Sequence, residues 1–440
     1  MPRLFGTDGV RGIAGTELTS DLAFRLGEAA GALLAGPGGR IVVGRDTRAS
    51  GEMLETALAD GMRAAGCDVL LAGIIPTPAV ALLTRTLGAQ AGAVISASHN
   101  PAEYNGIKFF SAEGFKLPDG IEAAIEDRVA AAEPQAAAAV GRTLAIEDAV
   151  ETYVAHALST VPEGLAGLKV ALDCGHGAAA VSSEQAFRRL GAEVVAINCE
   201  WSGTDINAGC GSTHVEALID LVRESGADLG IAHDGDADRT LAVDEAGAVV
   251  DGDRIMAIAA ARMMHEGRLP NDTVVSTVMA NMGFDVAMRD LGIRVLKTGV
   301  GDRYVLEEMR ATGAALGGEQ SGHVVFMDYA TTGDGLVTAL QLARVMHVTG
   351  RTLSALAAIM TRYPQVLVNV RVADKGAAAD CAALAAAVEA EERVLGSRGR
   401  VLVRPSGTEP LVRVMVEAAD EAIARASADR LVAVVERELG

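Results

Sequence analysis

Aromatic side chains are scarce in this chain, since Phe, Trp and Tyr together make up 3% of its 440 residues. Half of the residues are nevertheless hydrophobic, so a large core can form and disorder is not expected. Abundant alanine and glycine favour close packing of helices on sheets, as in an α/β protein, over an aromatic-rich β-sandwich. Because a domain usually holds about 100–200 residues, the length predicts three or four domains.

Positive charge and paired cysteines are scarce too. The net charge is −20, whereas general binders of polyanions are more often basic, so we expect no nucleic-acid partner. The five cysteines form no C-x-x-C pair, which fits a reducing cytosol. The start "MPRLFGTDGVRG" has no apolar signal segment, and no stretch of about 18 apolar residues could span a bilayer. We therefore expect a cytoplasmic protein without a membrane partner.

Strand and helix patterns alternate through most of the chain. Apolar strands are expected at 40–44, 68–73 and 91–98, with helices between them, which indicates parallel βαβ units. The pattern restarts twice, and its last strand is expected at 314–326. After Tyr363 and Pro364 the strands dominate and form a smaller α+β unit. We expect four domains that pack around a shared site: 1–153, 154–253, 254–364 and 365–440.

The stretch "HDGDADR" carries three acidic residues at a spacing of two: Asp234, Asp236 and Asp238. In an extended loop they would lie on one face and repel one another unless a cation neutralises them. Oxygen ligands of this kind suit Mg²⁺. An EF-hand ending at Glu245 is an alternative, but Arg239 stands where its turn needs glycine. A solvated acidic turn is the other alternative.

The stretch "SASHNP" ends a buried strand with Ser98 and His99. An ordinary capped turn before Pro101 would explain these residues. We expect the side chains of Ser98 and His99 to diverge, so they are not predicted to form a Ser–His catalytic pair. A serine can instead be activated or phosphorylated against a metal, which would connect Ser98 with the three aspartates.

Two further stretches carry polar groups suited to a sugar phosphate. "RVLVRPSGTEPLVRV" offers a nest for a dianionic phosphate, unless it is only a polar hairpin turn: Arg404, Ser406, Gly407, Thr408 and Arg413. "GGEQSGHVV" places Glu319, Ser321 and His323 at alternate positions, and on an extended segment they would share one face and grip sugar hydroxyls or an amine. A polar strand edge is the alternative there. Arg11, Arg45 and Arg48 could be surface charges, and Lys297 lies in a glycine-rich stretch.

The stretch "LKVALDCGHGAAA" imitates a dinucleotide-binding fingerprint. Gly175, Gly177 and Ala180 stand between a strand and a helix, and Glu200 follows the next strand. This pattern would predict an NAD-dependent oxidoreductase. It leaves the aspartate triplet unexplained, and His176 crowds the tight turn.

Five motifs in chain order resemble the α-D-phosphohexomutase family over essentially the whole chain: "GTDGVRG", "SASHNP…NGIKFF", "DGDADR", "GEQSGH" and "RPSGTEP". The resemblance implies an α/β fold of three similar domains and a smaller C-terminal α+β domain around a central cleft. It implies a phosphoserine at Ser98 and one Mg²⁺ per subunit, held by that phosphate and the three aspartates. It places the remaining catalytic residues at Arg11, His99, Lys108 and His323.

The same resemblance implies the ligands. Glu319 and Ser321 would bind the sugar, and residues 404–413 its non-reacting phosphate. Gln320 and "KTGVGDRYV" favour the branch that interconverts glucosamine 6-phosphate and glucosamine 1-phosphate for cell-wall synthesis, primed by a sugar 1,6-bisphosphate. The alternatives are the glucose and mannose branch and a non-catalytic sugar-phosphate-binding protein. A monomer or homodimer is expected. Two departures are His176, whose role is open, and Ala237, where glycine is common.

Overall fold

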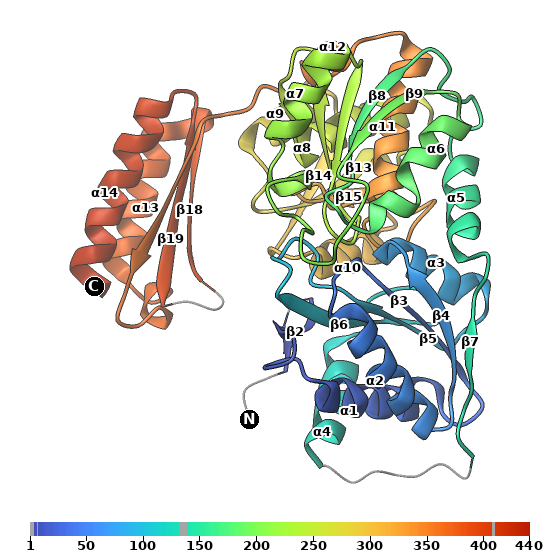
Figure 1. Cartoon of the computed structure of the whole chain (residues 1–440). Coiled ribbons are helices and arrows are strands. Elements are labelled where there is room, and N and C mark those ends of the chain that lie inside the picture. The colour runs from blue at the N-terminus through green and yellow to red at the C-terminus, as the bar shows by residue number, and fades with distance from the viewer. Residues whose placement is uncertain (1–3, 7, 132–138, 407–409) are drawn as a thin grey trace. The chain divides into compact units, whose positions relative to one another are not determined.

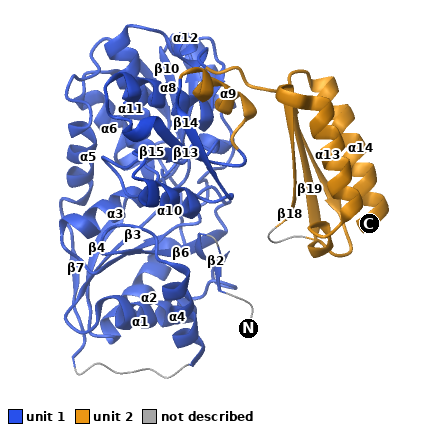
Figure 2. Ribbon diagram, turned by 180° about the vertical axis from the view of Figure 1, so that it is seen from behind, with its two compact units in different colours: residues 1–279, 292–359 blue, residues 280–291, 360–440 orange. Residues whose placement is uncertain are grey.

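The computed structural model describes residues 4–6, 8–131, 139–406 and 410–440. The chain divides into two compact units, which Figure 2 colours separately. One consists of residues 1–279 and 292–359, and the other of residues 280–291 and 360–440. Among the described residues, the first unit contains three sheets and the second contains one.

The first sheet has the strand order β1-β2-β6-β5-β3-β4-β7. Its strands are β1 (Phe5–Gly6), β2 (Gly9–Ile13), β3 (Arg40–Arg45), β4 (Asp68–Ile74), β5 (Ala91–Ile95), β6 (Tyr104–Ser111) and β7 (Thr143–Ala145). Strands β5, β3 and β4 run parallel, as predicted, and β7, which was not predicted, runs parallel to β4. Strands β1, β2 and β6 add antiparallel pairs at one edge. Parallel strands bring their carboxyl ends to one edge, so "RDTR" after β3 and "SASHNP" after β5 meet there.

Small residues allow the helices of this region to pack closely. Figure 1 shows α1 (Ser20–Ala30), α2 (Gly51–Ala64) and α4 (Asp119–Ala131) on one side of the sheet and α3 (Thr77–Thr86) on the other. A Cβ atom on Gly27 would lie 2.1 Å from the Leu58 carbonyl oxygen, and one on Gly61 would lie 2.0 Å from that of Phe24. Helices α1 and α2 can therefore approach this closely only with glycine at both positions.

The second sheet, of order β12-β11-β10-β8-β9, carries the aspartate triplet. Its strands are β8 (Lys169–Asp173), β9 (Glu193–Ile197), β10 (Leu229–His233), β11 (Thr240–Asp244) and β12 (Val249–Val250), and its helices are α5 (Ala149–Ser159), α6 (Ser183–Arg189) and α7 (Glu216–Ser225). Strands β10 and β11 are antiparallel, and His233 pairs with Thr240. Residues 234–239 are consequently the turn between two buried strands.

The third sheet has the order β14-β13-β15-β16. It consists of β13 (Thr273–Thr277), β14 (Arg294–Thr298), β15 (Leu316–Gly318) and β16 (Val324–Phe326), accompanied by α8 (Gly252–His265), α10 (Asp302–Thr312), α11 (Gly335–Thr349) and α12 (Leu353–Ala357). Strands β15 and β16 are antiparallel, with Gly318 paired to Val324. The prediction of one continuous strand over 314–326 is therefore wrong, because the chain reverses at 319–323.

The second unit contains an antiparallel sheet of order β17-β19-β18. Its elements are α9 (Met282–Asp290), β17 (Gln365–Arg371), α13 (Ala382–Leu395), β18 (Gly399–Pro405), β19 (Leu411–Ala418) and α14 (Glu421–Leu439). Alternate residues Val412, Val414 and Val416 are buried in one cluster with Leu431 of α14. The buried Glu417 accepts the backbone N–H of Met282 at 2.8 Å, which attaches the start of α9 to this unit.

The predicted fold class is confirmed: three α/β sheets precede a smaller α+β sheet. Each predicted domain contains one sheet, although the domain boundaries stay predictions. The sequence analysis did not identify β6, α5 or α11, and the strand expected over 91–98 ends at Ile95. In the described parts of the chain, no helix is long and apolar enough to cross a bilayer.

Candidate active site

Ser98 lies in a tight loop that follows β5. Its backbone has φ 52°, in the left-handed region that residues other than glycine rarely adopt. The residue is 1% exposed. The backbone N–H of Ser98 donates to Ser96 Oγ at 2.8 Å, and Ser96 Oγ donates to Asp46 at 2.6 Å. These bonds fix a strained backbone and hold the serine hydroxyl in one direction, as a reacting group requires.

The buried Arg48 binds the backbone carbonyl groups of the same loop. Arg48 is 1% exposed and pairs with Asp46 at 2.9 Å. Its guanidinium donates to the carbonyl oxygen of Ser98 at 2.9 Å and to that of Asn100 at 2.8 Å, and also to those of Pro101 and Tyr104. The interpretation of Arg48 as a surface charge is therefore wrong.

The three aspartates converge on one point. One carboxylate oxygen from each of Asp234, Asp236 and Asp238 lies within 4.8 Å of the others, and all three residues are buried. The geometry differs from the predicted extended loop, because residues 234–238 form a turn in which Ala237 has φ 56°. The turn achieves the convergence that the spacing predicted, and it does so by a left-handed residue rather than by strand alternation.

The turn lies against the serine loop. Ser98 Oγ donates to Asp234 Oδ2 at 2.6 Å. Asp236 Oδ2 accepts from Lys108 Nζ at 2.8 Å and from Thr77 Oγ1 at 2.6 Å. The structure thus brings the serine and the aspartate triplet into direct contact, whereas their connection through a metal stays a prediction.

The charges of the aspartate turn are unequal. Burial, together with repulsion from Asp238 and Asp236, raises the pKa of Asp234 well above its ordinary value. Burial and the neighbouring Asp236 also raise the pKa of Asp238. For Asp236 burial acts in the same direction, but the ammonium of Lys108 outweighs it and holds the pKa of Asp236 below its ordinary value. Asp236 is therefore the most readily ionised of the three carboxyls, whereas Asp234 and Asp238 ionise only against burial and mutual repulsion.

The donor set fits a divalent cation. Asp236 Oδ1 and Asp238 Oδ1 are buried and have no hydrogen-bond partner among the described residues. Buried carboxylate oxygens without partners are costly, and a hard cation with oxygen ligands removes that cost. The EF-hand alternative is excluded, because β11 begins at Thr240 and Glu245 at its far end bonds Ser354.

His99 lies closer to the serine than we expected. Its Nδ1 is 3.3 Å from Ser98 Oγ, so the prediction that the two side chains diverge is wrong. The same nitrogen accepts from Arg239 at 3.1 Å, and burial with the charges of Arg239 and Arg11 lowers the pKa of His99 to about 4. The nearer acceptor for the serine proton is Asp234 at 2.6 Å. His99 is therefore a neutral neighbour of the serine rather than its principal hydrogen-bond partner.

A chain of alternating charges extends from the aspartate turn. Lys108 pairs with Asp236 and lies 3.6 Å from Asp8, which also contacts Arg11 and Lys116. Lys116 in turn pairs with Asp302. Burial opposes the positive charge on Lys108, but Asp236, Asp8 and Asp238 raise its pKa well above the ordinary value.

His323 closes this chain. Its Nε2 lies 3.4 Å from Asp302 and 3.9 Å from Asp238, and the ring is 2% exposed. The structure thus unites Lys108, Arg11 and His323, which lie far apart in the sequence. Sequence reasoning missed Asp8, Lys116 and Asp302, although the quoted motifs contain both aspartates.

The "GEQSGH" segment is a turn rather than an extended strand. The backbone N–H of Glu319 donates to the His323 carbonyl at 3.0 Å, and that of Gly322 to the Glu319 carbonyl at 3.1 Å. Ser321 is exposed, Glu319 is half-buried and His323 is buried. The prediction of one shared face is therefore wrong: His323 turns into the charged chain, whereas Ser321 at the tip faces solvent. Glu319 accepts the Gly301 N–H at 3.2 Å, and Lys297 is exposed on β14.

The second unit carries the predicted phosphate-binding residues. Arg404 of β18 and Arg413 of β19 are direct cross-strand partners, so two positive charges stand side by side. Burial and the neighbouring Arg413 lower the pKa of Arg404. Ser406 is buried, and its carbonyl accepts from Lys375 at 2.8 Å. Gly407 and Thr408 lie outside the described residues. Like charges opposite one another are unfavourable unless an anion joins them, so this edge suits a phosphate.

The dinucleotide-like fingerprint has a packing explanation. A Cβ atom on Gly177 would lie 2.5 Å from the Gly235 carbonyl oxygen, and that oxygen accepts the Ala178 N–H at 2.8 Å. The loop after β8 therefore packs against the aspartate turn. His176, whose backbone has φ 52°, accepts Thr47 Oγ1 on its carbonyl oxygen at 2.6 Å, so it joins this loop to the first sheet.

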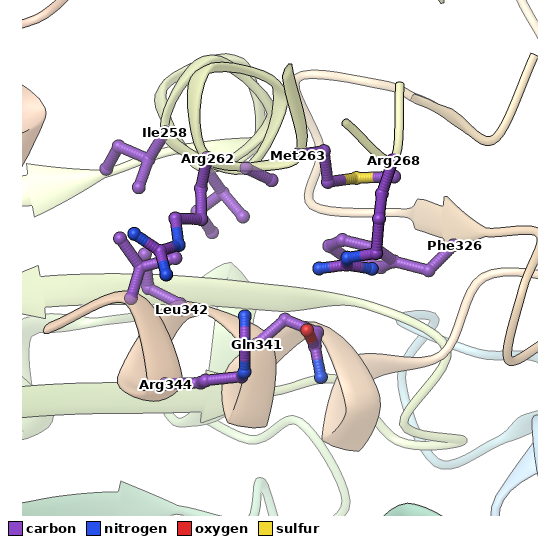
Figure 3. Close-up of a pocket in the computed structure, with 11 residues that line it drawn as sticks. Ile258, Arg262, Met263, Arg268, Phe326, Gln341, Leu342 and Arg344 are labelled. Atoms are coloured by element: carbon purple, nitrogen blue, oxygen red, sulfur yellow. The ribbon is translucent and has the colours of Figure 1, made fainter. Parts of the chain in front are cut away.

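A separate pocket lies between α8 and α11. Figure 3 shows Arg262, Arg268 and Arg344 among the side chains that line this pocket. Its volume of about 10 Å³ leaves room for at most about one water molecule, and it contains none of the sequence-predicted residues. Arg262 and Arg344 donate to Glu266 Oε1 at 2.6 and 3.0 Å, and Arg268 donates to Glu266 Oε2 at 2.6 Å. The arginines already share an acidic partner, so they form a structural ion cluster.

Comparison with known proteins agrees with these observations. Models of the phosphoglucomutase/phosphomannomutase family match in order: α/β/α domain I at 2–136, domain II at 151–247, domain III at 251–363 and the C-terminal domain at 367–434. Phosphoglucosamine mutase of Rhodococcus jostii is 55% identical over 99% of both chains, and that of Moorella thermoacetica is 57% identical over 96% of both.

A solved structure gives the same result for the fold. A phosphoglucomutase/phosphomannomutase family protein from Burkholderia thailandensis superposes with a TM-score of 0.85 at 26% identity, covering 99% of this chain and 97% of its own. The order of the four domain matches is the order of the four sheets described above. The chain belongs to the phosphoglucomutase/phosphomannomutase family of α-D-phosphohexomutases.

Proposed function

We propose that this protein is a mutase that interconverts glucosamine 6-phosphate and glucosamine 1-phosphate through a phosphoserine at Ser98. One observation carries the reaction type: the buried Ser98 hydroxyl donates at 2.6 Å to Asp234, a member of the three-aspartate turn. Relatives of the same length that are 55–57% identical bear the name phosphoglucosamine mutase, which supports the choice of sugar.

Asp234, Asp236 and Asp238 would hold one Mg²⁺, with the Ser98 phosphate as a further ligand. The Oδ1 atoms of Asp236 and Asp238 accept no hydrogen bond from the described residues, which supports this assignment. When bound, the ion polarises the phosphoryl oxygens and stabilises the negative charge that develops as the group is transferred.

The reaction has two balanced halves. In the first, the bond between phosphorus and Ser98 Oγ breaks, a bond from phosphorus to the free sugar hydroxyl forms, and the hydroxyl proton is returned to Ser98 Oγ. The product is a sugar bisphosphate. After that molecule turns around, the bond between its other phosphorus and the sugar oxygen breaks, a bond from that phosphorus to Ser98 Oγ forms, and the Ser98 hydroxyl proton passes to the sugar oxygen. A sugar 1,6-bisphosphate therefore also serves as primer for an unphosphorylated chain.

Residues around Ser98 would stabilise the charge of the transferring group and exchange protons with the sugar. Lys108 and Arg11 would stabilise the transferring group, and their position in the chain of charges that reaches the aspartate turn supports this role. His323 is the group of this chain that can exchange a proton with a sugar oxygen, and His99 would contact the same phosphoryl group as a neutral donor or acceptor.

The remaining residues would bind the parts of the substrate that do not react. Glu319 and Ser321, on the turn between β15 and β16, would bind the amine and hydroxyls of the sugar. Arg404, Ser406, Gly407, Thr408 and Arg413 would bind the other phosphate. The cross-strand pair of Arg404 and Arg413 supports this, because it brings two guanidinium groups to one anion.

The testing experiment compares kcat/KM for glucosamine 6-phosphate and for glucose 1-phosphate, with Mg²⁺ and a sugar bisphosphate present. A strong preference for the amino sugar supports the proposal. An equal or reversed preference would retain the mutase chemistry and assign the hexose branch. A protein that binds both sugars, turns over neither and carries no phosphate on Ser98 would be a binding protein, and the proposal would be wrong.

A further inference from the structure

Two cysteines lie in contact behind the aspartate turn. Cys174 follows β8 and Cys199 follows β9, and their Sγ atoms are 3.4 Å apart. Cys174 is fully buried, whereas Cys199 is half-buried. The bond length of a disulfide is about 2.05 Å, so the two sulfur atoms would have to approach each other by more than an ångström to be joined.

The pair packs directly on the aspartate turn. Cys174, Ala179 and Ala237 form one buried apolar cluster, and Cys199 packs against it. Ala237 is the left-handed residue between Asp236 and Asp238, and its φ of 56° already makes the turn strained. A displacement of Cys174 would therefore reach the residue that sets the spacing of two aspartates.

A second connection leads to the serine loop. The Gly175 carbonyl accepts the Asn207 N–H at 2.9 Å, and the Asn207 side chain donates to the Ser98 carbonyl at 2.9 Å. Gly177 and Ala178, on the other side of His176, contact the Gly235 carbonyl. Cys174 thus belongs to a loop that contacts the aspartate turn directly and reaches the serine loop through Asn207.

The two thiols differ in pKa and in exposure, as the attacking and resolving cysteines of a reactive pair do. The hydrogen bond between the two thiols lowers the pKa of Cys199, and the same bond together with burial raises the pKa of Cys174. Cys199 is consequently the thiol that more readily becomes a thiolate, and it is also the more accessible one. The described residues hold three other cysteines, Cys67, Cys210 and Cys381, and burial raises the pKa of Cys67 to about 11 and that of Cys210 to about 12.

We propose that Cys174 and Cys199 are a peroxide-sensitive pair, whose oxidation to a disulfide distorts the aspartate turn and lowers its affinity for a divalent cation. The Cys199 thiolate attacks one oxygen of hydrogen peroxide and becomes a sulfenic acid, with release of water after protonation. The Cys174 thiol then attacks that sulfur and forms the disulfide, with loss of a second water. Two thiols and one peroxide thus give one disulfide and two waters, and a dithiol reductant reverses the change.

The first test needs no enzymatic activity. The full-length protein is treated with hydrogen peroxide, denatured in acid, alkylated and digested, and the disulfide-linked peptides are mapped by mass spectrometry. We expect a Cys174–Cys199 link in the native protein and weaker binding of Mn²⁺, used as the probe cation, after oxidation. Absence of that link, or a Cys199 sulfinic acid in its place, would overturn the proposal.

The second test uses matched variants. Cys199→Ser should form no link and keep its Mn²⁺ affinity after peroxide, whereas Cys381→Ser, which changes a half-buried cysteine of the other unit, should behave like the original chain. Where mutase activity is measurable, oxidation should lower it by at least about tenfold, because a misplacement of about 1 Å can cost on the order of 100-fold. Equal loss of Mn²⁺ affinity in Cys199→Ser would contradict the proposal even if the sugar assignment is wrong.

Discussion

Two charge clusters of the first unit, one buried and one half-buried, lead to opposite conclusions. The aspartate turn brings together three carboxylates and leaves one oxygen of Asp236 and one of Asp238 without a hydrogen-bond partner among the described residues. Around Glu266, three arginines surround one carboxylate, and both of its oxygens accept hydrogen bonds. Arg344 further binds Glu163 at 2.7 Å. Density of charge alone thus does not identify a site.

What separates the clusters is whether the charges are satisfied within the protein. The Glu266 cluster joins α8 to α11 and is complete without a ligand, although it lines a pocket (Figure 3). The aspartate turn is not satisfied in this way, since it has buried carboxylate oxygens that accept no hydrogen bond from the described residues. The Ser98 hydroxyl lies beside these carboxylates. Unsatisfied groups in a fixed arrangement indicate ligand binding, whereas satisfied ones indicate stability.

Removing the serine hydroxyl should have the largest effect. Ser98→Ala deletes the oxygen that would carry the phosphoryl group, so kcat should fall on the order of 10⁴-fold or more while the melting temperature stays near that of the original chain. Enzyme assay and thermal unfolding measure the two quantities. Ser159→Ala, at an exposed serine of α5, is the control. A Ser98→Ala protein with undiminished turnover would disprove the phosphoserine mechanism.

Neutralising one aspartate should weaken the cation site. Asp236→Asn removes a carboxylate charge beside Lys108, so we expect a loss of rate on the order of 100-fold and a higher Mg²⁺ requirement. A Mg²⁺ titration of the rate and direct Mn²⁺ binding would measure both effects. Asp220→Asn, on the exposed face of α7, should change neither. An unaltered metal response in Asp236→Asn would contradict the ligand assignment.

A substitution at Arg48 tests whether its hydrogen bonds to the Ser98 loop position the serine. Arg48→Lys keeps the charge but cannot reach four carbonyl oxygens and Asp46 together. We expect kcat to fall by about 10–100-fold with little change in KM, and a loss of stability of about 3 kcal/mol. Arg45→Lys is the matched control, because Arg45 makes one ion pair with Glu55 at 3.3 Å. Equal effects of the two changes would remove the special role of Arg48.

The Glu266 cluster should affect stability and leave activity unchanged. Burial opposes ionisation of Glu266, but hydrogen bonds from Arg268, Arg344 and Arg262 lower its pKa to about 2. A depressed carboxyl pKa stabilises the fold above its unfolded-state value, and this contribution disappears as the pH falls from about 4.5 towards 2. Glu266→Gln should therefore cost about 1–2 kcal/mol at pH 7 and less at pH 3. Urea unfolding at the two pH values measures this, and a cost independent of pH would contradict the explanation.

Ala237→Gly should have the smallest effect. Glycine relieves the left-handed strain, worth about 1–2 kcal/mol, but adds about 0.4–1 kcal/mol of freedom to the unfolded chain. We expect a net gain of about 0.5 kcal/mol in urea unfolding. A loss of more than 1 kcal/mol would mean instead that the methyl group's packing on Cys174 dominates.

The sequence predicted the fold class and the residues of the aspartate turn, because their spacing and the strand pattern are local properties. It did not predict that Arg48 is buried, because the carbonyl groups that bind its guanidinium belong to residues 98–104, which are distant in the sequence. It also did not predict that Asp8, Lys116 and Asp302 share one chain of charges, since they meet only in three dimensions. The reversal at 319–323 was missed because alternating polar residues resemble a strand edge.

That reversal has a consequence for how the specificity of such an enzyme can be changed. A Cβ atom on Gly322 would lie 2.2 Å from the Thr240 carbonyl oxygen, and one on Gly252 would lie 2.1 Å from that of Glu319. The turn is therefore wedged between the start of β11 and the start of α8, and its backbone cannot lengthen without displacing both. Under the proposed role of Glu319 and Ser321, a mutagenesis library aimed at a new sugar should vary the side chains at 319–321 and keep the number of residues in the loop constant.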